Sequence, residues 1–272
     1  MKFGVFVHPD RPKVPQEEIT HKIEKAGFAF AENPDVAIVV GGDGTFGYYG
    51  RILQIPMLFV GVKESTILGS RARLAEISYN NLEKALADIE QERYSIIKRK
   101  MLSVNFLDQS CDVLIDTYLE RGAFSGCIRY KVHVKDKDRG NEFCDYGIGN
   151  GVIVSTAFGS GGYFSYPDRI EHGRWDGNLA NFSDDRIGIC HIVPAYLMRK
   201  KNAVMSLSHK VAYTIPHSAQ IDIELVRNAD VRLYGVAVHS TGVPISINDK
   251  ITISQSAKNA KIIKLKNQNY RK

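Results

Sequence analysis

Residues 36–45 read VAIVVGGDGT, five apolar residues that lead directly into a glycine-rich turn. An uninterrupted β-branched run of this kind is typical of a parallel strand buried on both faces. The residues after the turn follow a helical pattern up to about residue 54. The stretch therefore predicts a buried strand, a tight loop and a helix.

The neighbouring segments repeat this alternation. Further apolar runs occupy residues 3–7 and 57–62, and helical patterns occupy residues 15–26, 45–54 and 81–92. In the first helix Ile19 and Ile23 share a face, and Gly27 marks its end. Strands that alternate with helices at this spacing are typical of an α/β layer. We predict an α/β domain over residues 1–98.

The pattern changes after the basic residues 98–100. From there to residue 255, short alternating or β-branched segments are separated by Gly, Asn, Asp and Pro, without a long amphipathic helix. Such a pattern predicts a β-rich sandwich domain over residues 99–255. Residues 256–272 then form a basic C-terminal tail.

Composition narrows the class of protein. The chain has 272 residues, 44% hydrophobic and 24% charged, which is ordinary for a globular protein. Its net charge is +6, but residues 258–272 hold six Lys or Arg and no acid, which leaves 30 basic against 30 acidic residues elsewhere. A broad basic face for nucleic acid is therefore not expected.

Targeting and metal signals are weak. The apolar run in the N-terminal MKFGVFVHPDRP is too short for a signal peptide. The sequence has no run of about 18 apolar residues, the length needed to span a membrane. The four cysteines form no C-x-x-C pair, and the eight histidines show no metal-ligand spacing. We expect a soluble cytoplasmic protein with reduced thiols, no membrane partner and no metal-ligating residues.

The turn Gly41-Gly42-Asp43-Gly44-Thr45 carries the clearest chemical signal. Glycines bring backbone N–H groups close to a ligand, and the helix N-terminus after them favours an anion such as phosphate. The turn lacks the lysine of a P-loop and the spacing of a dinucleotide fingerprint. Asp43 would repel phosphate unless it has a task, such as accepting a proton from an attacking hydroxyl or holding Mg²⁺. The alternative is a tight strand-to-helix turn in which Asp43 caps the helix.

A second loop follows a predicted strand. Residues 149–163 read GNGVIVSTAFGSGGY, in which small residues from Ser155 to Gly162 allow close approach of a flat ligand. Tyr163 offers a ring that can lie beside such a ligand. The alternative is a β-turn in which Tyr163 packs into the core.

The two motifs together resemble the NAD kinase family. Its first motif is GGDGT after a buried strand, and its second reads roughly G-D-G-x-x-x-S-T-P-T-G-S-T-A-Y. Phe46 and Arg51 also match the continuation of the first motif. Lipid kinases usually have an Asn-Glu pair after GGDGT, which FGYYGR at residues 46–51 lacks, and no threonine–aspartate loop of the phosphofructokinase type follows.

The resemblance implies a fold and an activity. The fold is a Rossmann-like α/β domain, a β-sandwich and a C-terminal segment that returns to the first domain, in a homodimer or homotetramer. The activity is transfer of the γ-phosphoryl group of ATP or polyphosphate to the adenosine ribose 2′-hydroxyl of NAD, with Mg²⁺ or another divalent cation. Asp43 would be catalytic. The nucleotide-binding residues would be Gly41, Gly42, Gly44, Thr45, Phe46, Arg51, Asp116, Asn150, Ser155, Thr156, Gly159 and Tyr163.

The chain departs from the family at positions that read the substrate. Ile115-Asp116 stands where the family has Asn-Glu, Asn150 stands where it has Asp, and Ala237-Val238-His239 falls near its Asp-Gly-Gln turn. The phosphate loop is intact, so an altered acceptor is possible. The alternatives are a GGDGT-type kinase for a polyol, sugar or lipid, and a non-catalytic dinucleotide-binding protein.

Two segments allow two interpretations each. The basic tail is either a solvated end or a strand-like return segment that lies against the α/β domain and adds positive potential near a phosphate site. Residues 168–185, which hold the only tryptophan, Trp175, are expected to form an exposed loop or a lid.

Overall fold

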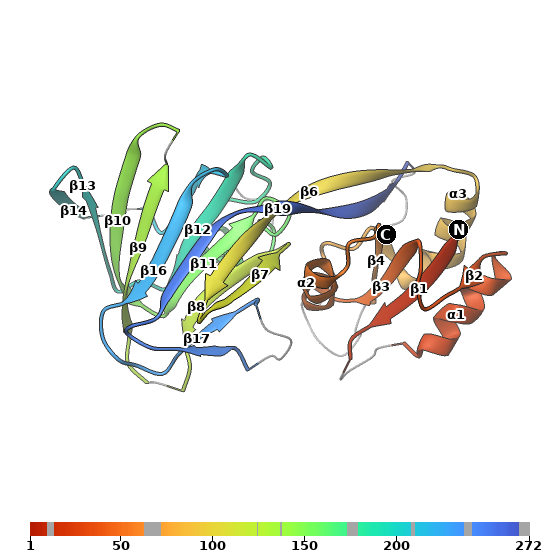
Figure 1. The fold of residues 1–272 in the computed structure, drawn as a ribbon, viewed down its shortest axis with the longest axis horizontal. Helices are drawn as coiled ribbons and strands as arrows, with labels where there is room; N and C mark the ends of the chain where they lie inside the picture. Colours follow the sequence, from red (N-terminus) through yellow and green to blue (C-terminus); the bar gives the residue numbers. More distant parts are fainter. Residues whose placement is uncertain are drawn as a thin grey trace. The chain divides into compact units, whose positions relative to one another are not determined.

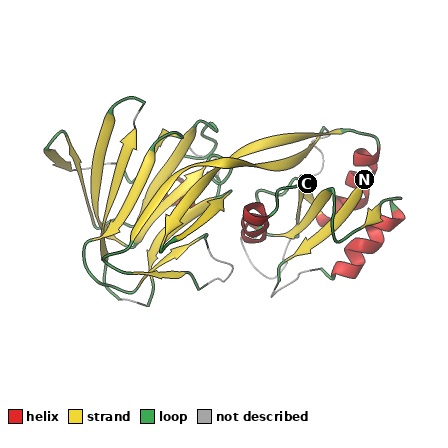
Figure 2. Cartoon of the chain, viewed as in Figure 1, coloured by secondary structure: helices red, strands yellow, loops and turns green. Residues whose placement is uncertain are grey.

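The computed structural model of the chain describes residues 1–9, 14–62, 72–123, 125–136, 138–172, 179–207, 210–236 and 241–266. The chain divides into two compact units, Met1–Arg99 with Asn259–Lys272, and Lys100–Lys258 (Figure 1). Helices are concentrated in the first unit, and the second is built almost entirely of strands (Figure 2). No helix of the described ranges is long and apolar enough to cross a membrane.

The N-terminal unit is a parallel sheet with helices. Its strands are β1 (Lys2–Val7), β2 (Ala29–Phe30), β3 (Val36–Gly41), β4 (Met57–Gly61) and β5 (Ile77–Ser78), and its helices are α1 (Gln16–Lys25), α2 (Asp43–Ile52), η1 (Tyr79–Asn81) and α3 (Leu82–Glu90). The strands lie in the order β2-β1-β3-β4, with β5 also beside β4, and all are parallel. Every residue of β3 and β4 is buried, which confirms the predicted α/β layer.

The boundaries of α2 differ from the prediction. The helix begins at Asp43, two residues before the predicted start, and Gly42 is its N-cap in extended conformation. A carboxylate in the first turn is favoured by the helix dipole, so the GGDGT motif supplies the first turn of the helix as well as the loop.

The second unit consists of two antiparallel sheets. One has the order β14-β13-β10-β9-β16-β19, with β6 beside β19 and β7 beside β6, and the other has the order β15-β12-β11-β8-β17-β18. These strands are β6 (Tyr94–Phe106), β7 (Gln109–Val113), β8 (Asp116–Arg121), β9 (Ile128–Asp136), β10 (Asn141–Gly149), β11 (Gly151–Thr156), β12 (Arg186–Ile192), β13 (Tyr196–Lys201), β14 (Val204–Leu207), β15 (Ala212–Pro216), β16 (Gln220–Leu225), β17 (Val231–Tyr234), β18 (Val243–Ile245) and β19 (Lys250–Leu265).

A single apolar core joins the two sheets. Val132 and Ile221 from one sheet share a cluster with Leu119 and Val154 from the other. This packing confirms the β-sandwich fold class that the short alternating segments predict.

A short helical segment corrects one expectation. After the 3-10 turn η2 (Tyr163–Ser165), helix α4 (Tyr166–His172) covers the first residues of the segment expected to be a loop. The Tyr166 hydroxyl donates to the carbonyl of His191 at 2.8 Å, which fixes the start of the helix on β12. Trp175 lies outside the described residues, so the interpretation as a lid stays a prediction.

Strand β19 belongs to both units. Its first half pairs with β16 through Ile253, and Ile262 in its second half pairs in parallel with Met57 of β4. Ile263 and Leu265 are buried in the core of the N-terminal unit. The prediction that the C-terminal segment returns to the α/β domain is therefore confirmed for this strand, and a wholly solvated tail is wrong. Residues 267–272 lie outside the described residues.

Glu76 anchors the end of β19. Its carboxylate accepts a hydrogen bond from the backbone N–H of Leu265 at 3.0 Å and is also paired with Lys264. Glu76 is 9% exposed, so its replacement would leave these donors without their partner.

We expect Glu76→Ala to lower the free energy of unfolding by about 1–3 kcal/mol, because a buried N–H and an ammonium lose their acceptor. Urea unfolding measures the change, and limited proteolysis should show earlier cleavage near Lys266. Glu83→Ala is the matched control, because Glu83 makes only exposed ion pairs with Lys22 and Lys25. Equal unfolding midpoints for the two variants would contradict the anchoring role.

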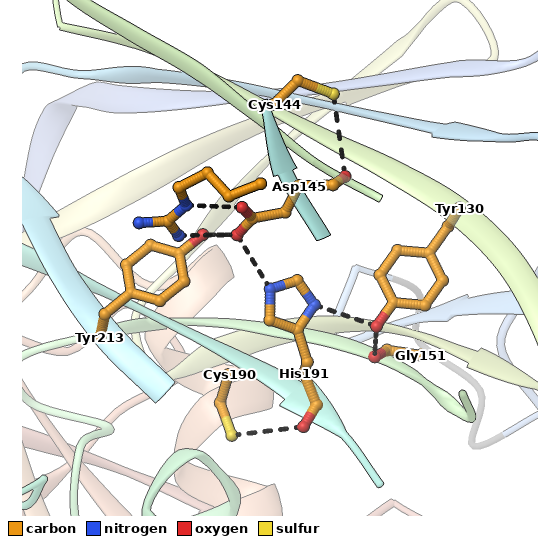
Figure 3. A network of polar contacts seen from close by, with 8 residues as sticks. Tyr130, Cys144, Asp145, Gly151, Cys190, His191 and Tyr213 are labelled. Carbon is orange, nitrogen blue, oxygen red and sulfur yellow. Dashed lines mark hydrogen bonds and ion pairs between the residues drawn. The ribbon is translucent and has the colours of Figure 1, made fainter. Parts of the chain in front are cut away.

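A buried polar network crosses the sandwich from sheet to sheet (Figure 3). Asp145 on β10 is fully buried and accepts hydrogen bonds from Arg199 Nε at 2.7 Å and Nη2 at 2.8 Å. From the other sheet, Tyr213 donates to the same carboxylate at 2.7 Å, and His191 Nε2 lies 3.2 Å from it. Burial alone would raise the pKa of Asp145, but the hydrogen bonds from Arg199, His191 and Tyr213 lower it to about 2.

The network continues beyond His191. Its Nδ1 lies 3.0 Å from the Tyr130 hydroxyl, which donates to the carbonyl of Gly151 at 2.7 Å (Figure 3). The chain of contacts therefore links β9, β10 and β13 of one sheet to β11, β12 and β15 of the other. Its members are satisfied by one another, as buried polar groups must be.

Candidate functional site

The GGDGT turn joins β3 to α2. Gly41 ends the strand, and a Cβ at this position would come within 2.6 Å of Thr45 Oγ1, so only glycine fits. Gly42 is the N-cap and has no side chain to cap the first N–H groups of the helix. These N–H groups and the helix dipole make the turn suitable for an anion.

Gly42 and Gly44 are glycines for a different reason. No described atom lies within 4 Å of a Cβ built at either position, and neither residue has a positive φ. The packing of the chain therefore does not require glycine at these two positions. Their open surroundings leave the backbone accessible to a ligand.

Asp43 is held in place by the segment before β5. Its Oδ1 accepts a hydrogen bond from the backbone N–H of Leu74 at 2.9 Å. Because Gly42 is the N-cap, the interpretation of Asp43 as the cap of α2 is wrong. Among the described residues Oδ2 has no protein partner, so one carboxylate oxygen remains for chemistry.

The other predicted residues of this motif have different positions. Phe46 is fully buried and stacks on Phe59 of β4 with ring centroids 4.5 Å apart, so it packs in the core beneath the turn. Arg51 lies in the last turn of α2, where its guanidinium is 5.5 Å from the Tyr48 ring. Eight residues of helix separate it from Asp43, which is about 12 Å along the axis. The backbone of Arg51 therefore lies at the other end of the helix from the turn.

The second motif lies in the C-terminal unit, after β11. Thr156 Oγ1 donates to the carbonyl of Leu114 at 2.6 Å and accepts from the N–H of Gly159 at 3.1 Å. Ser155 is fully buried, and its hydroxyl donates to the carbonyl of Thr156 at 3.0 Å. A Cβ at Gly159 would come within 2.4 Å of the Ile115 carbonyl oxygen. The hydroxyls and the glycine therefore shape the loop.

Asp116 and Tyr163 lie beside this loop. Asp116 begins β8 opposite Ser155 of β11, and its Oδ2 is 3.9 Å from the position of a Cβ built at Gly162. The Tyr163 ring meets the Tyr118 ring edge-on at 5.3 Å, and its hydroxyl donates to Glu120 Oε1 at 3.4 Å. Tyr163 is half-buried.

Three neighbours of this loop were not predicted from the sequence. Tyr118 and Glu120 share one face of β8 with Asp116, and Tyr234 of β17 stacks on Tyr118 with centroids 5.0 Å apart. The alternation of DTYLE would have indicated Tyr118 and Glu120 once Asp116 was chosen. Tyr234 had no such signal, because the pairing of β8 with β17 joins distant parts of the chain.

The pKa values of this cluster are shifted by burial and charge. Burial, together with the charges of Asp116 and Glu120, raises the pKa of Tyr118 to about 12. Burial also raises the pKa of the Glu120 carboxyl, against the opposing effect of the Tyr163 hydrogen bond. Both shifts show that the face of β8 is partly removed from water.

Comparison with known proteins agrees with the resemblance to NAD kinases. The chain is 28% identical over 246 residues to an NAD kinase of Magnetococcus marinus, covering 88% of this chain and 71% of that protein. It is 29% identical over 244 residues to an NAD kinase of Caldanaerobacter subterraneus subsp. tengcongensis, covering 87% and 75%. Over most of its length the chain is therefore similar to NAD kinases.

Solved structures share the NAD kinase fold. An NAD kinase from Archaeoglobus fulgidus in complex with ATP aligns with a TM-score of 0.67 and 18% identity, covering 100% of this chain and 95% of that one. Yeast NADH kinase complexed with NADH aligns with a TM-score of 0.69 and 14% identity, covering 99% and 85%. No family model matches the chain.

The residues that differ from the NAD kinase motifs do not all lie beside the loop after β11. The Ile115 side chain is buried, and its carbonyl accepts from the N–H of Thr156 at 2.9 Å. Asn150 lies at the opposite end of β11 from Ser155, about 17 Å along the strand, so the structure does not bring it to the loop. Residues 237–239 lie outside the described residues.

The described carboxylates decide whether the chain could hold a metal ion. Within the described ranges no group of three or more His, Cys, Asp or Glu could hold an ion. A single carboxylate with a free oxygen, such as Asp43, is nevertheless what Mg²⁺ needs when substrate phosphates supply its other ligands. The residues present therefore fit a cation that arrives with a nucleotide.

Proposed function

We propose that this protein phosphorylates the adenosine ribose 2′-hydroxyl of NAD to make NADP, with ATP or polyphosphate as the donor. Homology to NAD kinases indicates a kinase-like enzyme, and the finer assignment rests on one observation. The GGDGT turn has an uncapped helix N-terminus, two glycines open to a ligand, and a carboxylate fixed at the first helical residue.

The donor phosphates would bind the backbone N–H groups of residues 41–45. The helix dipole of α2 offsets part of their negative charge. Mg²⁺ or another divalent cation held by the donor phosphates would neutralise further charge. Positioning and charge stabilisation supply most of the catalysis in phosphoryl transfer.

Asp43 is the proposed general base. The ribose 2′-oxygen forms a bond to the γ-phosphorus, and the bond from that phosphorus to the bridging oxygen breaks, which leaves ADP. The proton of the 2′-hydroxyl passes to the free Oδ2 of Asp43. The hydrogen bond from Leu74 to Oδ1 keeps the carboxylate oriented for this step.

The C-terminal unit would supply the nucleotide contacts. Asp116 offers a carboxylate to hydroxyl or amino donors, and Tyr163 offers its ring. Ser155, Thr156 and Gly159 act by holding the loop in shape. Ile115 removes the amide that the family has before the carboxylate, so fewer polar contacts recognise the adenosine.

The loss of a polar side chain at position 115 favours two other functions. The chain could phosphorylate another hydroxyl compound, such as a polyol, sugar or lipid, or it could bind a dinucleotide without turnover. The buried apolar side chain of Ile115 is the observation that favours both.

Incubation with ATP, Mg²⁺ and NAD tests the three functions. We expect NADP, measured with an NADP-specific dehydrogenase. Consumption of ATP only with another acceptor would support the second function, and NAD binding without turnover would support the third. A homodimer or homotetramer is proposed from the family resemblance, and light scattering after size exclusion measures its mass.

The difference between Gly44, which has open surroundings, and Gly41, which does not, leads to a testable prediction. Gly44→Ala should leave the unfolding temperature unchanged or raise it, because alanine is favoured over glycine in a helix by up to about 1 kcal/mol. Its KM for ATP should nevertheless rise about tenfold or more, because a methyl group obstructs the approach of phosphate to the backbone.

Gly41→Ala is the contrasting variant. Its Cβ would clash with Thr45, so it should lower the unfolding temperature. Thermal denaturation and NADP assays on both proteins separate the roles. A Gly44→Ala protein with unchanged KM would show that phosphate does not approach this residue.

A further inference from the structure

Strand β14 (Val204–Leu207) ends one sheet of the C-terminal unit (Figure 1). One side of the strand pairs with β13 in antiparallel register, from Lys201 opposite Val204 to Met198 opposite Leu207. In the part of the chain that the structure describes, no strand pairs with its other side. The backbone N–H and C=O groups on that side can therefore pair with a further strand.

The other edge strands of this unit carry residues that discourage such pairing. β7 contains Asp112, which is paired with Lys258. β15 ends at Pro216, and β18 contains Pro244. Charges and prolines are common means by which proteins keep an edge strand from pairing with another chain. β14 reads VMSL, with neither a charge nor a proline, and all four of its residues are exposed.

Apolar side chains gather on the same part of the surface. Thirteen large apolar side chains of the described residues are exposed, and five of them lie between positions 193 and 207. These five are Val193, Tyr196, Val204, Met205 and Leu207. A concentration of this kind, unlike single exposed side chains, is typical of an interaction surface.

The register of the sheet places the side chains of β14 on two faces. Directly opposite residues of an antiparallel pair share a face. Ser206 lies opposite Arg199, which lies opposite the fully buried Asp145, so Ser206 belongs to the face that covers the sandwich core. Met205 and Leu207 alternate with Ser206 and therefore belong to the outer face.

A second copy of the chain fits both faces of β14. Two β14 strands can pair antiparallel about a two-fold axis perpendicular to the sheet, which joins like faces. If the axis passes through Ser206, Met205 of each copy lies opposite Leu207 of the other copy on the outer face, and Ser206 lies opposite itself on the inner face. Apolar pairs and hydroxyl pairs are both favourable across strands. β14 is thus complementary to itself.

Charge does not oppose this pairing. β14 has no charged residue, and the nearest lysines are Lys200 and Lys201 of β13. Three strand spacings, at least about 14 Å, would separate their backbones from those of the same residues in the second copy. This separation exceeds the Debye length of about 8 Å at physiological ionic strength, so the repulsion is largely screened.

We propose that β14 is a dimerisation edge, through which two copies of this chain join their sheets into one continuous antiparallel sheet. The inference does not rest on the proposed reaction, because neither the GGDGT turn nor the loop after β11 takes part in the pairing. It goes beyond the homo-oligomer proposed from the family resemblance, since it names the surface and the register. Four residues a side bury less than the roughly 1,200 Å² of a stable interface, so the dimer should dissociate on dilution to micromolar concentrations.

A cysteine at position 206 tests the register. In the pairing centred on Ser206 the two Cα atoms are about 4.5–5.5 Å apart, within the range of a disulfide. Mild oxidation of full-length Ser206→Cys at about 100 µM, roughly a hundredfold above the micromolar range of a weak contact, should give a cross-linked dimer on a non-reducing gel. Ser95→Cys, an exposed serine of β6, is the matched control and should match the wild type, whose four cysteines set the background. Equal cross-linking in the two variants would overturn the proposal.

Met205→Lys tests the edge without a covalent bond. A lysine here supplies the protection that β14 lacks and places an ammonium beside Leu207 of the other copy. Sedimentation at the same concentration should show the wild type at twice 30.4 kDa and the variant at 30.4 kDa. Ile96→Lys is the matched control, because Ile96 of β6 is 47% exposed, like Met205, and should leave the dimer intact. Both variants should keep the unfolding temperature of the wild type in dilute solution, since both replaced side chains are exposed.

Two results would count against the dimerisation edge. A wild-type protein that is a monomer at this concentration would leave β14 to a strand of another protein. A dimer whose mass Met205→Lys leaves unchanged must join through another surface, and the homo-oligomer proposed from the family resemblance would then stand without this edge. If NADP does not form but the cross-link and the dissociation are observed, the kinase assignment fails and the dimerisation edge stands.

Discussion

Asp43→Asn is expected to reduce the kcat for NADP formation by about 10²- to 10⁴-fold, the usual contribution of a positioned general base. An amide cannot accept the proton of the ribose hydroxyl and binds Mg²⁺ poorly. The substitution keeps an oxygen that can accept the hydrogen bond from Leu74, so the fold should be unaffected. Initial rates at saturating ATP and NAD, with thermal denaturation alongside, measure both effects.

Two further variants separate chemistry from positioning. Asp43→Ala removes the acceptor for Leu74 as well, so it should lose activity and also loosen the segment before β5. Asp35→Asn is the matched control, since Asp35 is an exposed carboxylate that accepts from the backbone of Lys2. Full activity in Asp43→Asn would contradict the role given to this residue.

The largest effect on stability is expected at Asp145. Asp145→Ala should lower the free energy of unfolding by about 3 kcal/mol, because removal of the fully buried carboxylate leaves the half-buried guanidinium of Arg199 without its counter-charge. Tyr213 and His191 would lose their common acceptor at the same time. Urea unfolding followed by circular dichroism measures the loss. Asp185→Asn, an exposed carboxylate in the same unit, should leave the unfolding midpoint unchanged.

The lowered pKa of Asp145 predicts that the free energy of unfolding depends on pH. The pKa of Asp145 is lowered from 3.8 to about 2 in the folded protein, so its contribution to stability is fully present above about pH 4. It is lost as the pH falls from about 4 toward 2, and it amounts to about 2 kcal/mol, because one pKa unit equals about 1.4 kcal/mol. Unfolding free energies of Asp145→Asn should lack this part of the acid dependence. Parallel pH curves for the two proteins would show that the network does not stabilise the folded state.

Local patterns predicted the strand, turn and helix that carry Asp43. VAIVV and GGDGT are neighbours in the sequence, and a buried strand followed by a helix places them at the same sheet edge whatever the rest of the chain does. Only the start of α2 differed, because Asp43 is favourable within the first turn of a helix as well as before it. Phe46 and Arg51 show the limit of motif reasoning, since a match in sequence does not distinguish a ligand contact from a core or distal position.

In the C-terminal unit, the arrangement of the predicted residues depends on pairing between strands that are far apart in the sequence. Asp116, Gly159 and Tyr163 meet because β8 pairs with β11, and Tyr234 joins them because β17 pairs with β8. Asn150 comes just before β11 and Ser155 lies near its last residue, so the two residues are at opposite ends of the strand. Neither outcome follows from spacing along the chain, because a strand separates its two ends by about 3.3 Å per residue.

By itself the sequence determined the α/β and β-rich fold classes, the GGDGT turn between a buried strand and a helix, and the resemblance to the NAD kinase family. These depend on residues close together in the chain, whose periodicity and backbone freedom act locally. Only the tertiary structure decided that the basic C-terminal segment ends as a buried strand tied to Glu76, and that Tyr118, Tyr163 and Tyr234 form one cluster with two carboxylates. The reason is physical, since these contacts arise from strand pairing and burial between segments that the sequence keeps far apart.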